Sequence, residues 1–290
     1  MTKLKLGIPK GSLETATVGL FGQAGWTIKS SSRNYFPSID DPEISCALVR
    51  SQEMGPYVAG GTLDAGLTGI DWVTETQADV EKVCDLVYSK VSDQPCRWVL
   101  VVDRDSPIQK VEDLEGKKIA TELVGFTRRY LRERGINATV EFSWGATEAK
   151  VAEGLADAAV EITETGSTIR AHGLRIVCDL LRTHTILIAN KEAMADPARR
   201  AKIDQIALLL QAALAARHKV LLKMNVPAAR ITDVVGLLPS LNSPTINRLS
   251  DEDWMAIETV VGRHEVRDLI PRLKEKGAEG ILEIDITKMC

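Results

Sequence analysis

The sequence predicts an α/β protein that ends in a smaller module with a different strand order. Three observations support this class. Short apolar runs alternate with helical patterns up to about residue 190, which is typical of a sheet with crossover helices. A polar stretch near residues 90–96 interrupts the alternation, and the final segment follows the order β-α-β-β-α-β. The length of 290 residues suits two or three domains.

The first part of the chain contains three strand and helix pairs. Apolar runs bounded by turn residues predict strands over 3–9, 44–50 and 64–69. Helical spacing predicts helices over 12–25, ending near Gly25, and over 70–76. Between them, "QEMGPYVAGG" predicts a short helix that glycines break.

The alternation begins afresh after the polar stretch "YSKVSDQP", so we expect a boundary near 90–96. The strands expected beyond it cover 97–103, 117–122, 139–144, 156–162, 174–181 and 184–190. Helices are expected over 125–135 and 147–154, and a long one over 198–218. The apolar face of that long helix predicts a core or an interface.

The C-terminal segment predicts a ferredoxin-like module. Strands are expected over 219–226, 243–250, 254–261 and 278–286, and helices over 227–238 and 262–277. Their order matches the split βαβ arrangement.

Composition excludes several classes of function. A formal net charge of -4 gives no overall positive field for nucleic acid. Neither a membrane-length apolar run nor a signal peptide is evident, which indicates a cytoplasmic protein. The five cysteines form no CxxC pair, and the four histidines show no paired metal spacing.

The stretch "EITETGSTIRAHGL" places acids next to a small, hydroxyl-rich turn. Thr165, Gly166, Ser167 and Thr168 would offer hydroxyl and backbone donors at a helix N-terminus, which suits a phosphate. Glu161 and Glu164 would then accept from sugar hydroxyls or hold Mg²⁺. An ordinary helix start capped by Thr165 or Ser167 explains the same residues about equally well.

Taken together, five motifs resemble those of the ATP phosphoribosyltransferase family. They are "LGIPKGSLETA", "LDAGLTGIDWVTE", "FSWGATE", "EITETGSTIRAHGL" and, from the regulatory domain of the long form, "LPSLNSPTI". The resemblance covers essentially the whole chain. Three departures are Ser12 where the family usually has Arg, Glu161 where many members have Asp, and His172 where many have Asn.

The resemblance implies a glycosyltransferase that moves the phosphoribosyl group of phosphoribosyl pyrophosphate (PRPP) to N1 of ATP and releases pyrophosphate. It implies a two-lobed fold like that of periplasmic binding proteins, with lobe one over 1–92 and 183–211 and lobe two over 93–182. An ACT-like module over 212–290 would bind histidine as a feedback inhibitor. Homodimers or hexamers, Mg²⁺ bound mainly through PRPP, and no separate regulatory chain are also expected.

The same resemblance assigns residues to roles. For catalysis it implies Lys10, Glu161 and Glu164. For PRPP it implies Glu161, Glu164, Thr165, Gly166, Ser167 and Thr168. The ATP candidates are Lys10, Gly11, Arg50, Asp71 and Glu148, and the histidine candidates are Asn225, Ser243 and Thr245.

Simpler structural roles remain open for many of these candidates. A capping residue is the safer role for Asp71, and Glu148 could belong to a capping box. Lys10 could be a solvated turn lysine and Arg50 an exposed salt-bridge partner. Two rival functions also remain: a phosphoribosyltransferase acting on a free base, and a two-lobed sensor that binds its ligand without turnover.

Overall fold

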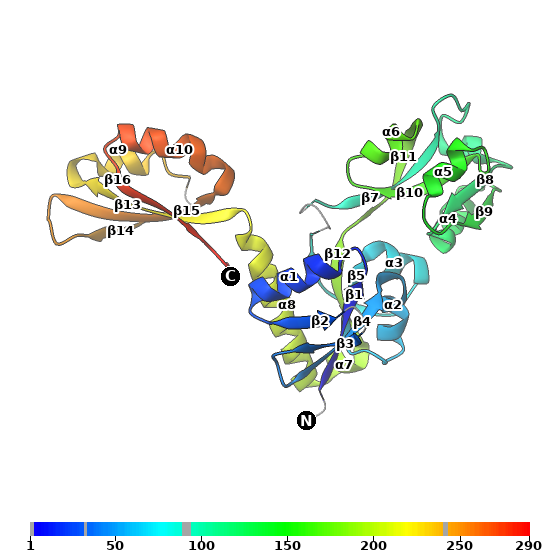
Figure 1. Ribbon diagram of the computed structural model, residues 1–290, viewed down its shortest axis with the longest axis horizontal. Coiled ribbons are helices and arrows are strands. Elements are labelled where there is room, and N and C mark those ends of the chain that lie inside the picture. The colour runs from blue at the N-terminus through cyan, green and yellow to red at the C-terminus, as the bar shows by residue number, and fades with distance from the viewer. Residues whose placement is uncertain (1–2, 32–33, 89–93, 240–242) are drawn as a thin grey trace. The chain divides into compact units, whose positions relative to one another are not determined.

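The computed structural model describes residues 3–31, 34–88, 94–239 and 243–290, and within these ranges the predicted α/β class is confirmed. The chain divides into two compact units: residues 1–22 with 26–207, and residues 23–25 with 208–290. The first unit contains two five-stranded sheets and the second a four-stranded sheet (Figure 1).

The first sheet has the order β4-β1-β5-β12-β6. Its strands are β1 (Leu4–Lys10), β4 (Ile44–Arg50), β5 (Ala65–Gly69), β12 (Thr185–Ala189) and β6 (Glu81–Leu86). Strands β4, β1 and β5 run parallel, whereas β12 is antiparallel to both β5 and β6. The helices of this part are α1 (Glu14–Ala24), α2 (Ser51–Ala59) and α3 (Ile70–Thr76). The carboxyl ends of the parallel strands lie at one edge, where open α/β sheets bind ligands.

The second sheet has the order β11-β7-β10-β8-β9. Its strands are β7 (Cys96–Asp103), β8 (Lys118–Thr121), β9 (Thr139–Phe142), β10 (Ala158–Thr163) and β11 (Leu174–Thr183). Helices α4 (Val124–Arg132), α5 (Thr147–Ala152) and α6 (Ser167–Ala171) and a 3-10 turn (Val111–Leu114) connect them. An apolar core that includes the fully buried Trp98 and Leu100 stabilises this sheet.

The chain passes between the two sheets twice. The first passage joins β6 to β7, and at the second passage only His184 separates β11 from β12. His184 Nε2 lies 2.7 Å from Asp85 Oδ1 on β6, and the His184 carbonyl accepts from Ile70 N at 3.1 Å. The hydrogen bond with the His184 side chain holds the pKa of Asp85 below its usual range. The second passage is therefore tied to β6 and to the start of α3.

Helices α3 and α4 form a two-way contact between the sheets. Glu75, near the end of α3, accepts from Gly125 N at 2.7 Å and from Phe126 N at 2.6 Å, in the first turn of α4. In return, Arg129 of α4 donates to the carbonyl oxygens of Thr74 and Glu75. The N-terminus of α4 thus receives a negative charge and the C-terminus of α3 a positive charge, as the helix dipoles favour. We call these five residues the α3–α4 clasp.

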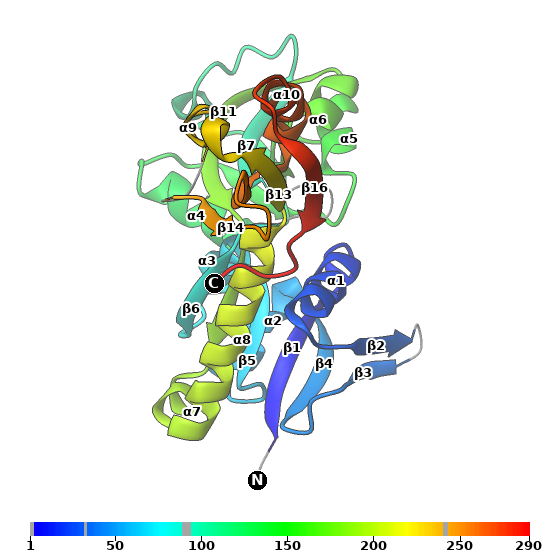
Figure 2. The same ribbon diagram turned by 90° about the vertical axis from the view of Figure 1, so that its left-hand side faces the viewer.

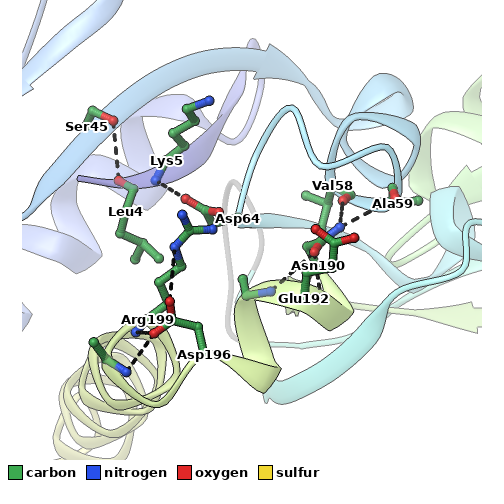
Figure 3. A network of polar contacts seen from close by, with 12 residues as sticks. Leu4, Lys5, Ser45, Val58, Ala59, Asp64, Asn190, Glu192, Asp196 and Arg199 are labelled. Carbon is green, nitrogen blue, oxygen red and sulfur yellow. Dashed lines mark hydrogen bonds and ion pairs between the residues drawn. The ribbon is translucent and has the colours of Figure 1, made fainter. Parts of the chain in front are cut away.

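A buried carboxylate fixes the start of the long helix α8 (Pro197–Ala216) against the first sheet (Figure 3). Asp64, just before β5, accepts from Lys5 N at 2.7 Å and from Arg199 Nη1 at 2.9 Å. Asp196 caps α8 by accepting from the backbone of Ala198 at 2.9 Å. The short helix α7 (Lys191–Ala195) has Asn190 as its cap.

The second unit has the strand order β14-β15-β13-β16, all antiparallel, as the ferredoxin-like prediction requires. The strands are β13 (Lys219–Pro227), β14 (Thr245–Arg248), β15 (Trp254–Gly262) and β16 (Glu279–Asp285). Helices α9 (Ile231–Val235) and α10 (Arg263–Glu275) lie on one face (Figure 1) and enclose a core with Leu222, Ile257 and Leu269.

Two predicted helices differ from the structure. Helix α2 ends directly before Gly60 and Gly61, as predicted, but it continues through Gly55, where a Cβ would lie 3.0 Å from Ala78 Cβ. The helix expected over 227–238 is a 3-10 turn (Ala228–Arg230) followed by the five-residue α9.

Some elements of the structure were not predicted from the sequence. They are the β2–β3 hairpin (Ile28–Ser31 and Asn34–Ile39) beside β4, visible in Figure 2, and β6 and α7. Strand β3 carries Pro37 and is mostly exposed, so its residues lack the alternation of buried and polar positions that marks a strand.

Candidate active site

Two of the cavities in the first unit, of about 420 Å³ and about 430 Å³, share Ile162 of β10 and Glu164, which follows that strand. The cavity of about 420 Å³ is lined by residues of both sheets, so we call it the inter-sheet cavity. It contains Lys10, Gly11, Ser12, Arg50, Asp71, Trp72, Tyr88, Trp98, Glu122 and Thr183, among others. The other space, the turn cavity, is bounded by Glu148, Glu161, Thr163, Thr165, Ser167, Thr168 and Ile169 in addition to the two shared residues.

The predicted phosphate turn lines the turn cavity. Gly166 has a φ of +74°, and its N–H donates to Thr163 Oγ1 at 2.8 Å. The hydroxyls of Thr165 and Ser167 lie 3.0 Å apart. The cap position of α6 is Gly166 itself, and neither Thr165 nor Ser167 occupies it. Thr165 Oγ1 nevertheless accepts from Ser167 N, at the start of the helix, at 3.3 Å, so the capping interpretation holds for that contact and not for the cap position. The glycine in the left-handed region shapes the turn.

Arg170 is a cation at this turn that the sequence analysis missed. Its Nη2 donates to the Thr165 carbonyl at 3.2 Å, and a Cβ on Gly166 would lie 3.0 Å from its Nη1. The spacing of an arginine one helical turn after a hydroxyl-rich loop could have indicated it. Arg170 brings positive charge to the rim of a cavity that otherwise contains several carboxylates.

Glu161 has an unusual environment in the turn cavity. Burial and the neighbouring Glu148 carboxylate raise the pKa of Glu161 to about 7, against weaker opposing hydrogen bonds. The side chain is therefore partly protonated near neutral pH. Such a carboxyl group can accept a hydrogen bond from a ligand hydroxyl, or donate one to it, when the ligand displaces the surrounding water.

Glu148 lies apart from the other ATP candidates. It is in the first turn of α5 and lines the turn cavity together with Glu161. The cap position of α5 is Ala146, with a φ of +48° and no side-chain cap hydrogen bond. The capping-box interpretation of Glu148 is therefore wrong. Its charge instead acts on Glu161.

Lys10 and Arg50 lie side by side at the carboxyl ends of β1 and β4, where they are partners in the parallel register. Both line the inter-sheet cavity with Gly11, whose φ is +103°. The Lys10 Nζ lies 3.8 Å from the centroid of the Tyr35 ring. No carboxylate of the described residues forms an ion pair with Lys10 or Arg50, so the salt-bridge interpretation of Arg50 is wrong. These two cations are available to an anion.

Asp71 is buried, with 3% of its surface exposed, and its carboxylate is committed to protein groups. Oδ2 accepts from Trp98 Nε1 at 2.7 Å and Oδ1 from Trp72 N at 3.0 Å. The cap position of α3 is Gly69, so the capping prediction for Asp71 is wrong. Burial raises the pKa of Asp71 despite these hydrogen bonds. Its role is to hold Trp98 of the second sheet against α3 of the first.

The aromatic walls of the inter-sheet cavity were not foreseen. Trp72 and Trp98 pack edge to face, with ring centroids 6.2 Å apart, and Tyr88 joins them in the lining. Their sequence context resembles ordinary core, and only the fold brings them together. Such rings provide a flat apolar surface for a planar base.

The three residues expected to bind histidine, Asn225, Ser243 and Thr245, belong to the second unit and are exposed. Thr245 of β14 is opposite Glu258 of β15, which in turn is opposite Lys223 of β13. Asn225 is two residues beyond Lys223, so Asn225 and Thr245 share the face of the sheet that α9 and α10 leave open. Ser243 precedes β14. None of the three lines either cavity described above.

Neither a metal cluster nor a membrane-spanning helix is found among the described residues. In the ranges given above, no group of three or more His, Cys, Asp or Glu side chains is arranged so that it could hold a metal ion. In the same ranges, no helix is long and apolar enough to cross a membrane. Oxygen donors for a hard cation are nevertheless present at Glu161 and Glu164.

Comparison with known proteins gives consistent matches along the chain. A family model described as ATP phosphoribosyltransferase matches residues 50–212, and one described as HisG, C-terminal domain, matches residues 216–288. The ATP phosphoribosyltransferases of Desulfatibacillum aliphaticivorans and Geotalea uraniireducens are 61% and 60% identical over 286 residues. Each comparison covers 99% of this chain and 98% of the relative.

Among solved structures, a chain from the ATP phosphoribosyl transferase (HisG:HisZ) complex of Thermotoga maritima is similar to this one. It has a TM-score of 0.62 and 26% sequence identity, and the comparison covers 72% of this chain and 96% of that chain.

Proposed function

Because this chain belongs to the ATP phosphoribosyltransferase family of histidine biosynthesis, we propose that it transfers the phosphoribosyl group of PRPP to N1 of ATP, releasing pyrophosphate. The observation that carries the proposal is the pair of adjoining cavities. One contains a phosphate-type turn, the other contains two cations and aromatic walls, and Glu164 belongs to both. A reaction between two phosphate-bearing substrates needs such an arrangement.

PRPP binds in the turn cavity. Thr165, Gly166, Ser167 and Thr168 hold its 5′-phosphate through hydroxyl and backbone donors, and Arg170 adds positive charge beside them. Glu161 and Glu164 bind the ribose hydroxyls. The turn is held by its own hydrogen bonds before any ligand arrives, so little ordering is needed on binding.

ATP binds in the inter-sheet cavity. Lys10, Gly11 and Arg50 contact its phosphates, and the rings of Trp72 and Tyr88 border its adenine. Asp71 acts through Trp98 and contacts no substrate. Glu148 is more suitably placed as a neighbour of PRPP than of ATP.

The chemistry breaks the bond between C1 of ribose and pyrophosphate through a cation-like transition state. Adenine N1 is already a nucleophile, so the protein needs to orient it and does not need a strong base. Lys10 stabilises the charge that develops on the departing pyrophosphate, and Glu161 and Glu164 fix the ribose. Mg²⁺ bound with PRPP would neutralise the pyrophosphate, using oxygens of the substrate and of these glutamates.

The expected domain boundaries complete the proposal. Residues 1–92 and 183–211 form one catalytic lobe and residues 93–182 the other. Residues 212–290 bind histidine through Asn225, Ser243 and Thr245 and inhibit the enzyme. The chain assembles as homodimers or hexamers. The chain contains its own regulatory module, so it requires no separate regulatory subunit.

A single assay tests both parts of the proposal. Purified protein is mixed with Mg²⁺, ATP and PRPP, and the ultraviolet absorbance of N1-substituted adenine is followed with and without histidine. Product that appears, and decreases with histidine, supports transfer and feedback inhibition. Product that histidine does not affect contradicts the role of residues 212–290. If PRPP binds but ATP is not modified, assays with free bases distinguish another phosphoribosyltransferase from a sensor.

A further inference from the structure

Trp144 is an exposed indole beside the candidate active site that none of the proposed roles uses. It lies between β9 and α5 of the second sheet, and 65% of its surface is exposed. The guanidinium carbon of Arg50, from the first sheet, lies over the indole at 5.2 Å from its centroid. This distance is typical of a cation–π contact. The contact joins the two sheets at a residue that lines the inter-sheet cavity.

The loop that carries Trp144 is firmly held. Ser143 and Thr147 on either side are buried, and their hydroxyls lie 3.0 Å apart. Ser143 N donates to the Thr121 carbonyl at 2.9 Å. Ala146 occupies the left-handed region, with a φ of +48°, which a residue with a Cβ rarely adopts. A loop with this support presents the indole in a fixed position, and local strain of this kind is concentrated at functional sites.

The cation–π contact leaves the guanidinium N–H groups of Arg50 without a hydrogen-bond partner among the described residues. A guanidinium stacks through its flat face, while its five N–H donors point outward in the plane. Among the described residues, no carboxylate forms an ion pair with Arg50. The cation–π contact with Trp144 and binding of a phosphate are therefore compatible, because the contact with the indole does not use the N–H donors that would bind the phosphate.

We propose that Trp144 is a positioning residue that holds Arg50 with its donors available to the phosphate chain of the nucleotide in the inter-sheet cavity. The inference rests on the proposed function for the identity of that nucleotide. An unsupported arginine side chain samples many rotamers and loses this freedom when it binds a phosphate. Trp144 reduces that loss before ATP arrives. The indole belongs to the opposite sheet, so Arg50 is best positioned when the two sheets are close together.

The test compares Trp144→Leu with Trp144→Phe, which retains a ring. We expect the leucine variant to raise the KM for ATP about 2- to 5-fold, as loss of an exposed cation–π contact predicts. Its kcat and its KM for PRPP should stay within about 2-fold of wild type, and the phenylalanine variant should recover most of the affinity. Since Trp144 is exposed, the Tm of both variants should match that of wild type.

A double-mutant cycle with Arg50→Gln separates positioning from a general structural effect. Dissociation constants for tripolyphosphate and for pyrophosphate are measured by calorimetry in the absence of catalysis. We expect Trp144→Leu to weaken tripolyphosphate binding in the wild-type background and to have no effect in the Arg50→Gln background. An equal loss in both backgrounds, no loss in either, or a loss confined to pyrophosphate would overturn the proposal. Because tripolyphosphate needs no turnover, this result is independent of whether the enzyme forms phosphoribosyl-ATP.

Discussion

Replacing Glu161 with glutamine should stabilise the first unit above neutral pH while weakening PRPP binding. Burial beside Glu148 raises the pKa of Glu161 from 4.5 to about 7. The folded state therefore holds this proton more tightly than the unfolded state does. As pH rises past 4.5, the unfolded chain ionises freely and the folded chain does not, so Glu161 progressively destabilises the fold until about pH 7.

The magnitude follows from the size of the shift. A difference of about 2.5 pKa units corresponds to about 3 kcal/mol of unfolding free energy at 1.36 kcal/mol per unit. Glutamine cannot ionise, so the Glu161→Gln variant should avoid this cost at pH 8 and gain nothing at pH 5. For a unit of this size, the Tm difference at pH 8 should be roughly 5–10 °C.

The assay is thermal unfolding of the ligand-free protein at pH 5 and pH 8, followed by tryptophan fluorescence. Glu148→Gln serves as the matched control, because it removes one cause of the shift and leaves Glu161 ionisable. It should therefore give a smaller stabilisation at pH 8. A Tm difference that is equal at both pH values would refute the reasoning. In parallel, PRPP affinity should fall in Glu161→Gln at pH 8, because the carboxylate that binds ribose is gone, and should fall less at pH 5, where the wild-type side chain is already protonated.

Three further outcomes can be checked with purified variants. Glu75→Ala should lower the free energy of unfolding in urea by about 2–4 kcal/mol, because it leaves the first turn of α4 without two charge-assisted hydrogen bonds. The control is Glu53→Ala in the first turn of α2, which should lower it by less than about 1 kcal/mol. Gly166→Ala should abolish PRPP binding measurable by calorimetry and cost about 1 kcal/mol in stability, since the φ of +74° at Gly166 disfavours a Cβ. A variant with wild-type PRPP affinity would contradict the role of this turn in binding the 5′-phosphate. Asn225→Ala should weaken histidine inhibition at least about 5-fold without changing kcat, as loss of one or two hydrogen bonds predicts, and an unchanged inhibition curve would remove Asn225 from the site.

Local sequence was a good guide to elements that depend on local interactions. Helix α3 (Ile70–Thr76) starts at the predicted residue, because a glycine precedes it and its residues have helical spacing. Strand β4 also has its predicted bounds, Ile44–Arg50. The β2–β3 hairpin was missed because its exposed residues are stabilised by each other and by β4, and not by a buried face.

Contacts between distant segments account for the errors at the site. Asp71 has the residue type of a helix cap, yet its carboxylate accepts from Trp98, 27 residues away. Glu75 looks like a solvated helix residue, and its partners Gly125 and Phe126 are about 50 residues further along the chain. The shape of the turn at residues 165–168 could be anticipated because its glycine and hydroxyls are adjacent in sequence. The pKa of Glu161 could not, since it depends on Glu148 and on burial in the folded state.

The second passage between the sheets limits how they can move. With one residue, His184, between β11 and β12, the chain has almost no slack there. Sliding of one sheet past the other would break the strand pairing on both sides, whereas a change in the backbone torsions of His184 would not. The α3–α4 clasp is a second fixed point, formed by side chains instead of by the covalent chain. Rotation about an axis through these two points disturbs both of them least, so we expect opening and closing of the two sheets to follow that axis.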